Sequence, residues 1–500
     1  MSKLKFISKN IKYNAVSQVL TFLINFALLP FMVFHVGKEV YGVYILVVTF
    51  TGYMGLMDFG VGGTTIKYVA EFAPKGDNKK VNDIISASFS FFMIIGILAA
   101  ALLFMLSFCF DRIFKIDVYN MTIARHLFLI AAASSLFIWP GRTFDYALQG
   151  FQRYDRFAVN NIIFTVLTGI SAYFIFTNNM GIVCFLAVSS IFSILKCISA
   201  YLIVNKSILK EHIKFPYFHK ETFKMIFDFS FYLFLSSLAT ILIFNVDNII
   251  VGAFVTVAAV TLYNAGLNLQ QGFRMINALI EGPLFPAYVE MESKGELERQ
   301  RAILFKGTKY KAFVFIPFVL ITIIFAKPFI KCWMGDIFLA GVVPAQILIA
   351  FWLFNSILDI GAGMLTAKGY VKTIFKIVFI NAVANLGLSL ILVRYFGIIG
   401  VALGTTIPMV FISFPLFIWQ ILKTFKITFA EYFNSSIKDS LVVFAVAGVL
   451  AFIIRRALPV DRLWLVVFEM GAAYVITMFA AYTWLLSENE QSEIRSMIKF

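Results

Sequence analysis

One arginine of this chain lies deep inside a long run of uncharged residues. The stretch Thr261–Ile280 reads TLYNAGLNLQQGFRMINALI, and Arg274 is its only charged residue. In a helix that crosses a bilayer, a central charge costs about 2.5–3.5 kcal/mol and must face protein or water. A guanidinium in such a place can bind a phosphate group through two parallel hydrogen bonds. The alternative is a structural ion pair with an acid on a neighbouring helix.

Polar side chains share one face of the same predicted helix. Steps of four, three and three residues, which are helical spacings, separate Asn264, Asn268, Gln271 and Arg274. Asparagines in other apolar runs can hydrogen-bond sugar hydroxyls, or they can hold neighbouring helices together. The predicted substrate contacts are Arg274, Asn268, Gln271, Asn277 and Asn25.

Three acids within apolar runs are candidates for coupling or gating. Asp58 precedes a cluster of glycines, and its alternative is a plain acid at a helix end. Asp247 lies near the outer end of its run, where a gate contact competes with an ordinary interfacial residue. Asp359 can carry a proton or a sodium ion, or pair with Arg274. Lys196 lies near enough to a helix end to reach the membrane surface by snorkelling.

These residues need membrane-spanning helices to hold them. Hydrophobic residues make up 61% of the 500 and charged residues 14%, against about 45–50% and about 25% in soluble proteins. The apolar runs have the length of membrane helices and lack the alternation of an outer-membrane barrel. We therefore predict an all-α, polytopic membrane protein with fourteen spans, at residues 13–35, 41–63, 84–109, 121–144, 158–177, 181–204, 228–249, 258–283, 310–331, 339–365, 374–392, 396–420, 438–455 and 463–485.

The basic residues predict the orientation of these spans. Of the 42 lysines and arginines, 30 fall on the side of the N-terminus, 10 fall on the other side, and Lys196 and Arg274 fall within spans. Lys311 is counted among the first 30, at the start of the ninth span. Because cytoplasmic loops are enriched in lysine and arginine, both termini are predicted to be cytoplasmic. Cations so distributed suit membrane lipids, and we expect no nucleic-acid partner.

A weak internal repeat predicts two halves of the same orientation. Gly181 aligns with Gly397 and Tyr154 with Tyr370 at an offset of 216 residues, and Tyr44 aligns with Tyr263 at 219. A shift of six spans gives like-oriented lobes, and our hypothesis is that they leave a cleft and rock for alternating access. The predicted parts are an N-terminal lobe at 1–204, a cytoplasmic linker at 205–227, a C-terminal lobe at 228–420, appended spans at 438–485 and a cytoplasmic tail at 486–500.

Catalytic and cofactor motifs are missing from the sequence. There is no GxxxxGK[ST] phosphate loop, no HExxH, and no pairing of the 4 histidines at ligand spacing. We therefore expect no enzyme, no cofactor and no bound metal.

The N-terminal residues resemble a known family. A turn formed by Gly37, Tyr41, Gly42 and Tyr44 is followed by Asp58-Phe-Gly, then by Lys67 and by Ala70-Glu71. The pattern is similar to that of bacterial polysaccharide-biosynthesis flippases of the multidrug, oligosaccharidyl-lipid and polysaccharide exporter superfamily, including those of the O-antigen type. In the second half, NVDNIIVGAFVTVAAVTLYNAG resembles the equivalent opening, with Asp247 and Tyr263 in place.

The resemblance implies a flippase that moves an undecaprenyl-pyrophosphate-linked oligosaccharide from the cytoplasmic to the outer leaflet of a bacterial inner membrane. The implied partners are this lipid-linked oligosaccharide, membrane lipids and proteins of glycan assembly, with H⁺ or Na⁺ open as the coupling ion. Lys67 and Arg142, as loop cations, are further candidates to meet the pyrophosphate. Two alternatives remain open: a cation-coupled drug or small-solute antiporter of the same superfamily, and a membrane-embedded glycan ligase or polymerase.

Replacing Arg274 tests the predicted phosphate contact. We expect Arg274→Ala to abolish surface-glycan export without lowering expression, because the only deep guanidinium is lost. Arg274→Lys should recover part of the export, since it keeps the charge without the two parallel hydrogen bonds. Surface glycan and membrane-protein level, measured together in cells, check this, and full export by the alanine variant would contradict it.

Overall fold

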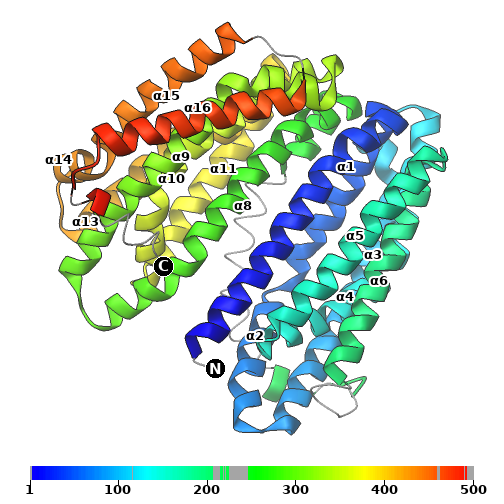
Figure 1. Cartoon of the computed structure of the whole chain (residues 1–500). Helices are drawn as coiled ribbons and strands as arrows, with labels where there is room; N and C mark the ends of the chain where they lie inside the picture. The colour runs from blue at the N-terminus through cyan, green and yellow to red at the C-terminus, as the bar shows by residue number, and fades with distance from the viewer. Residues whose placement is uncertain are drawn as a thin grey trace. The chain divides into compact units, whose positions relative to one another are not determined.

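Apolar runs of this length fold as helices because a helix satisfies its own backbone polar groups where water is absent. The computed structural model describes residues 3–114, 116–205, 214–217, 219, 221–223, 246–458, 462–488 and 490–492. Over these residues the chain is helical almost throughout and forms no β-strand (Figure 1). They include 11 helices long and apolar enough to cross a membrane. The prediction of an all-α, polytopic membrane protein is confirmed.

The number of spans stays a prediction. One candidate span, Lys12–Asp58, covers the predicted span 13–35 and residues 41–58 of the predicted span 41–63. The predicted span 258–283 forms helix α8 (Val257–Ser293), which is not among the eleven candidates. The predicted span 228–249 lies largely outside the described residues.

Contacts divide the chain into two compact units, which are described separately. Unit 1 comprises Met1–Thr261 and unit 2 comprises Leu262–Phe500, so that the boundary falls inside α8. Most of the predicted linker 205–227 lies outside the described residues. The predicted lobe boundaries therefore remain predictions.

Unit 1 is a bundle of helices packed along their lengths. They are α1 (Lys3–Tyr53), α2 (Val61–Phe72), α3 (Asn78–Ile113), α4 (Val118–Gly150), α5 (Tyr154–Thr177) and α6 (Gly181–Val204). Helix α3 packs along α4, α4 packs against α6, and α1 packs against α5 (Figure 1). One cluster of fully buried apolar side chains joins α2, α3, α4 and α6 and contains Val69, Ile85, Leu148 and Val204.

Two breaks in the helix lie in the region of the first two predicted spans. The first is at Gly37, whose φ of 79° and ψ of 163° are not helical, and it separates the two spans as the sequence predicts. The second is within the predicted span 41–63, where α1 gives way to a 3-10 turn at Met54–Asp58. Phe59 and Gly60 then both have positive φ, at 49° and 79°, before α2 begins. The helix of the predicted span 41–63 is therefore interrupted, because two left-handed residues in succession end it.

Unit 2 is built around a long central helix. Its elements after α8 are α9 (Leu297–Met334), α10 (Val342–Ala367), α11 (Val371–Phe396), α12 (Ile398–Pro408), α13 (Phe414–Phe425), α14 (Phe429–Tyr432), α15 (Lys438–Ala457) and α16 (Leu463–Trp484). Helix α9 packs against α10, α15 and α16, and buried residues such as Phe325, Ala451 and Ala473 join it to α15 and α16. Helix α9 begins thirteen residues before the predicted start of the ninth span. A helix can continue from lipid into water through charged residues, so the end of the apolar run does not mark the end of the helix.

Glycines let α11 and α12 approach closely. A Cβ on Gly400 would lie 2.2 Å from the Leu392 carbonyl oxygen, and one on Gly404 would lie 2.6 Å from the Ser389 backbone nitrogen. This is the small-xxx-small arrangement that membrane helices use where apolar side chains give no advantage over lipid.

Gly404→Ala tests this contact. The added methyl would meet backbone atoms that cannot move aside, so we expect a loss of about 1–3 kcal/mol in the free energy of unfolding. Gly387→Ala is the control, because nothing lies within 4 Å of a Cβ there, and it should keep or gain stability through the higher helix propensity of alanine. Thermal unfolding of the two purified variants measures the difference. Equal midpoints would contradict the packing described for α11 and α12.

Candidate functional site

A buried ion cluster joins three helices of unit 2. The Lys311 side chain on α9 is only 2% exposed, and its Nζ lies 2.6 Å from Glu281 Oε1 on α8 and 2.6 Å from Asp359 Oδ2 on α10. Asn355, one turn before Asp359 on α10, donates its side-chain amide to Asp359 Oδ1 at 2.8 Å. We call Glu281, Lys311 and Asp359 the triad. Burying one charge is costly, and this arrangement stabilises the ammonium with two acceptors of opposite charge.

The triad has an unmatched charge, and a buried hydroxyl without a hydrogen-bond partner among the described residues belongs to nearby Tyr288. One ammonium cannot neutralise two ionised carboxylates, so the fully ionised triad carries a net charge of −1. Tyr288, on α8 and 2% exposed, lies close enough to both acids to interact electrostatically. Its hydroxyl has no hydrogen-bond partner within the described part of the chain. A Cβ on Gly363 would lie 2.9 Å from the Tyr288 ring and 3.7 Å from Glu281 Oε2, which shows how tightly α8 and α10 pack here.

A second lysine of α9 has separate acid partners. Lys309 Nζ lies 3.1 Å from Asp439 on α15 and 2.9 Å from Glu490, beyond α16. Being two residues before Lys311, it points to the other side of the helix. Burial raises the pKa of Glu490, but the hydrogen bonds from Lys309 and Ser487 outweigh burial, so that this pKa lies below its ordinary value. Lys309 thus attaches α15 and Glu490 to α9.

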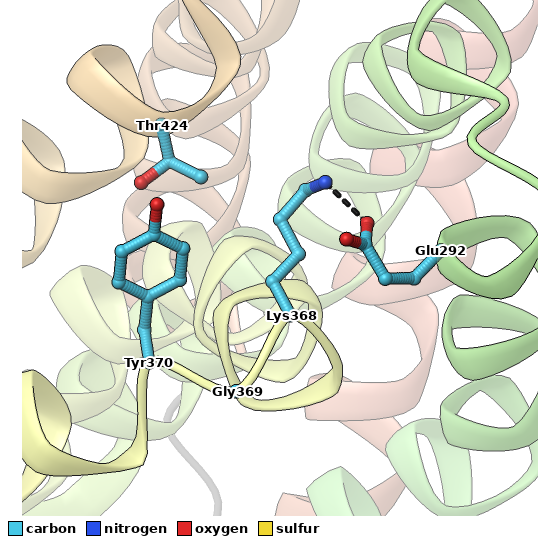
Figure 2. A pocket seen from close by; sticks show the side chains of 5 residues that line it. All are labelled: Glu292, Lys368, Gly369, Tyr370 and Thr424. Carbon is cyan, nitrogen blue, oxygen red and sulfur yellow. Dashed lines mark hydrogen bonds and ion pairs between the residues drawn. The ribbon is translucent and has the colours of Figure 1, made fainter.

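A polar cavity of about 250 Å³ lies where α8, α10 and α13 end, lined by Glu292, Lys368, Gly369, Tyr370 and Thr424. Figure 2 shows Lys368 joined to Glu292 on one side, and the Tyr370 hydroxyl facing the Thr424 side chain on the other. The Lys368 charge is already neutralised by Glu292. A lining of two hydroxyls and one ion pair therefore suits a hydroxyl-rich ligand better than a free anion.

Asp58, a predicted coupling or gating acid, lies at the second break of unit 1. Its Oδ1 accepts a hydrogen bond from the Gly62 backbone N–H at 3.0 Å, and its Oδ2 accepts one from the Tyr146 hydroxyl on α4 at 2.8 Å. The carboxylate thus satisfies a free N–H at the start of α2, as N-terminal acids commonly do, and joins this start to α4.

Lys196 does not stand alone at a helix end, so the snorkelling prediction is wrong. Its Nζ lies 3.5 Å from Asp145 Oδ2 on α4 and donates to Asn161 Oδ1 on α5 at 3.3 Å. Asn161 donates in turn to Ser17 and Thr21 on α1. The chain of contacts holds four helices of unit 1 together, because a membrane-embedded cation finds an internal acid more favourable than lipid.

The predicted substrate contacts are spread over two units. On α8, Gln271 and Arg274 are exposed, while Asn268 is half-buried and donates to Asn264 Oδ1 at 2.7 Å. Asn277 Oδ1 is buried without a hydrogen-bond partner in the described part of the chain. Asn25 is exposed on α1, in unit 1. The structure neither joins Asn25 to the α8 residues nor tests their role.

The other predicted coupling acids have partners that the sequence does not indicate. Asp247 is 1% exposed and lies close enough to Tyr53 of α1 to interact with it electrostatically, and the neighbouring Asn248 donates to Thr49 at 3.3 Å. Asp359 pairs with Lys311, where the sequence offered Arg274. Arg142 is not a loop cation, because it lies within α4 with its guanidinium 4.4 Å from the centre of the Trp139 ring.

Glu281 and Lys311 are the residues that sequence reasoning missed. In the sequence, Lys311 is counted among the cations at the end of a span. It follows Lys309 by two residues, however, which puts the two side chains on opposite faces of one helix. Glu281 lies within the predicted span 258–283, and an acid so placed is itself a signal for a functional site. The described residues contain no group of three or more His, Cys, Asp or Glu side chains that could hold a metal ion.

Known structures share the fold. The lipid II flippase MurJ, in an inward closed conformation, superimposes with a TM-score of 0.69 at 19% identity, over 94% of this chain and 98% of that one. An inward-facing multidrug resistance MATE family transporter of the MOP superfamily gives 0.66 at 15% identity, over 81% and 95%. The class of protein is therefore a polytopic membrane protein with the MurJ and MATE transporter fold.

Sequence comparisons give the family. Residues 7–292 match the family described as polysaccharide biosynthesis protein. The putative O-antigen transporter of Shigella flexneri is 24% identical over 409 residues, which cover 81% of this chain and 95% of that protein. This chain belongs to the polysaccharide biosynthesis protein family, which confirms the resemblance found in the N-terminal residues.

Removing one member of the triad tests its contribution to stability. We expect Lys311→Met to lower the free energy of unfolding by about 3–5 kcal/mol, because two buried carboxylates lose their counterion. Adding Asp359→Asn should recover part of this loss, since one unpaired charge then disappears. Thermal unfolding of purified protein is the measurement.

Lys75→Met serves as the control. This lysine pairs with Glu71 at 3.1 Å, but its side chain is 59% exposed, and such pairs are worth about 0–1 kcal/mol. A loss of equal size in the two lysine variants, or no recovery in the double variant, would contradict a buried charge cluster.

Proposed function

We propose that this protein moves a lipid-linked oligosaccharide, carried on undecaprenyl pyrophosphate, from the cytoplasmic to the outer leaflet of a bacterial inner membrane. The observation that carries the proposal is the family match over residues 7–292, and the likeness to a putative O-antigen transporter over 81% of the chain supports it. Movement is by alternating access, and both termini are cytoplasmic. Membrane lipids surround the bundle, and proteins of glycan assembly supply the substrate and use the product.

The pyrophosphate is the part of this substrate that needs a cation. Arg274 is exposed on α8, and its guanidinium has the geometry to bind a phosphate group through two hydrogen bonds. Gln271 and Asn268 lie one and two turns before it on the same face, and Asn277 lies about one turn after it. Their amides bind the polar groups next to the phosphates, and Asn25, on α1 of unit 1, is a separate proposed contact to the substrate.

The sugars need hydroxyl and amide partners more than charge. The cavity at Glu292, Lys368, Tyr370 and Thr424 offers a carboxylate, an ammonium and two hydroxyls at the end of α8. The end of α10 and the start of α11 meet at this cavity, and the loop that joins them is predicted to be cytoplasmic. In this function the cavity receives part of the glycan before translocation.

Proton coupling takes place at the triad. With a net charge of −1 when fully ionised, the triad becomes neutral when Glu281 or Asp359 takes up one proton. The charged triad costs more free energy within the membrane than the neutral triad, and this difference in free energy can drive a conformational change. Asp58, at the break before α2, and Asp247, packed on the end of α1, act in gating by holding these helix ends in place.

Neither alternative function has comparable support. An antiporter of drugs or small solutes shares the fold, but the likeness to MATE transporters is at 15% identity and shows the fold alone. A glycan ligase or polymerase would be an enzyme, whereas the relatives are named as a transporter and a flippase.

Reconstitution in vesicles tests the proposed function. The purified protein should move a fluorescent undecaprenyl-pyrophosphate oligosaccharide across the bilayer, and an imposed pH gradient should accelerate it. Asp359→Asn should move the lipid at a rate that the gradient no longer changes, because its triad is already neutral with Glu281 ionised and has no charge for a proton to cancel. Accessibility of the label to a membrane-impermeant quencher measures the movement.

Asp336→Asn is the matched control, since Asp336 is 73% exposed and begins the short 3-10 helix Asp336–Gly341 between α9 and α10. It should retain the full rate. If no lipid-linked oligosaccharide moves while drug cations are taken up, the antiporter would replace the flippase. If Asp359→Asn responds to the gradient like the unmodified protein, coupling lies elsewhere.

A further inference from the structure

The Lys311 ammonium occupies the position that a bound monovalent cation would take. It contacts one carboxylate oxygen from α8 and one from α10, each at 2.6 Å, and its side chain is 2% exposed. Both distances are short even for charge-assisted hydrogen bonds. The ammonium is thus enclosed by acidic oxygen atoms of two neighbouring helices.

The surroundings have the chemistry of a site for a hard cation. Such ions prefer carboxylate, carbonyl, amide and hydroxyl oxygens. Besides the two carboxylates, the Tyr288 hydroxyl lies near both acids, is buried, and lacks a hydrogen-bond partner among the described residues. Asn355 holds the second Asp359 oxygen with its amide. An oxygen set with two negative charges suits a monovalent ion together with a proton, and the set lacks the third acid common at divalent sites.

We propose that Lys311 is a tethered replacement for a sodium ion. While its ammonium lies between Glu281 and Asp359, the acid pair cannot bind Na⁺. Removing the ammonium and leaving the carboxylates in place converts the cluster into a Na⁺ site. The inference builds on the coupling role proposed for the triad, but it concerns cation binding in unit 2 alone, so that it can fail while the flippase activity stands, and the reverse.

The experiment measures Na⁺ binding by purified full-length protein. Lys311→Ala removes the ammonium and leaves room for an ion, and Lys311→Gln removes the charge while keeping most of the volume. Each is unfolded thermally in sodium chloride and in choline chloride at equal ionic strength, and each is incubated with radioactive ²²Na⁺. The control is the triple variant Lys311→Ala/Glu281→Gln/Asp359→Asn, which lacks the cation and both acids.

We expect the unmodified protein to respond equally to the two salts and to retain no ²²Na⁺. Lys311→Ala should retain about one ion per chain, with its unfolding midpoint raised by about 3 °C or more in sodium chloride, in proportion to the logarithm of its concentration. If this variant folds in sodium chloride but not in choline chloride, that result supports the proposal in the same way. The triple variant should lose the whole effect.

Four results would overturn the proposal. They are Na⁺ binding by the unmodified protein, no Na⁺ binding by either single variant, a sodium effect that persists in the triple variant, and failure of both single variants to fold in either salt. None of them depends on glycan translocation.

Discussion

The ion pair of Lys311 with Glu281 and Asp359 is the interaction on which unit 2 depends. A charged group within the membrane must find its partner inside the protein, because lipid offers none. Here a single side chain of α9 fixes both neighbours, α8 and α10, through contacts of 2.6 Å. Helix α8 also carries Arg274, so the triad sets the position of the helix that bears the predicted phosphate contact. Stability and the proposed function thus share one cluster.

Unit 1 meets the same requirement with weaker and more distributed contacts. Lys196 is 24% exposed and shares its charge between Asp145 and Asn161, which reaches α1 through Ser17 and Thr21. Asp58 stabilises a helix start and a tyrosine without any ion pair that the structure describes for it. In unit 2 the corresponding cation, Lys311, is 2% exposed and lies between two acids.

The membrane class, the break at Gly37 and the family were legible in the sequence, because each rests on local pattern. Helix boundaries near charged residues were not, since α9 continues thirteen residues before the predicted start of its span. Asp359 was recognised as unusual, but its partner depends on which helices are neighbours, and hydropathy does not give neighbours. Lys311 was missed for a related reason: a lysine near the edge of an apolar run has the same sequence signature whether it points into water or into the protein. The second break, at Phe59 and Gly60, follows Asp58, whose contact with Tyr146, 88 positions away, is not legible in the sequence.

The boundary between the compact units lies inside α8, after Thr261. Residues before it pack on α1, where Gly42 has no side chain and leaves room for the Val257 carbonyl, and the Thr261 hydroxyl donates to the Lys38 carbonyl oxygen at 2.7 Å. No cut in the chain therefore separates the two units without severing a helix. Expression of either unit as an isolated fragment would leave an open helix end inside the membrane.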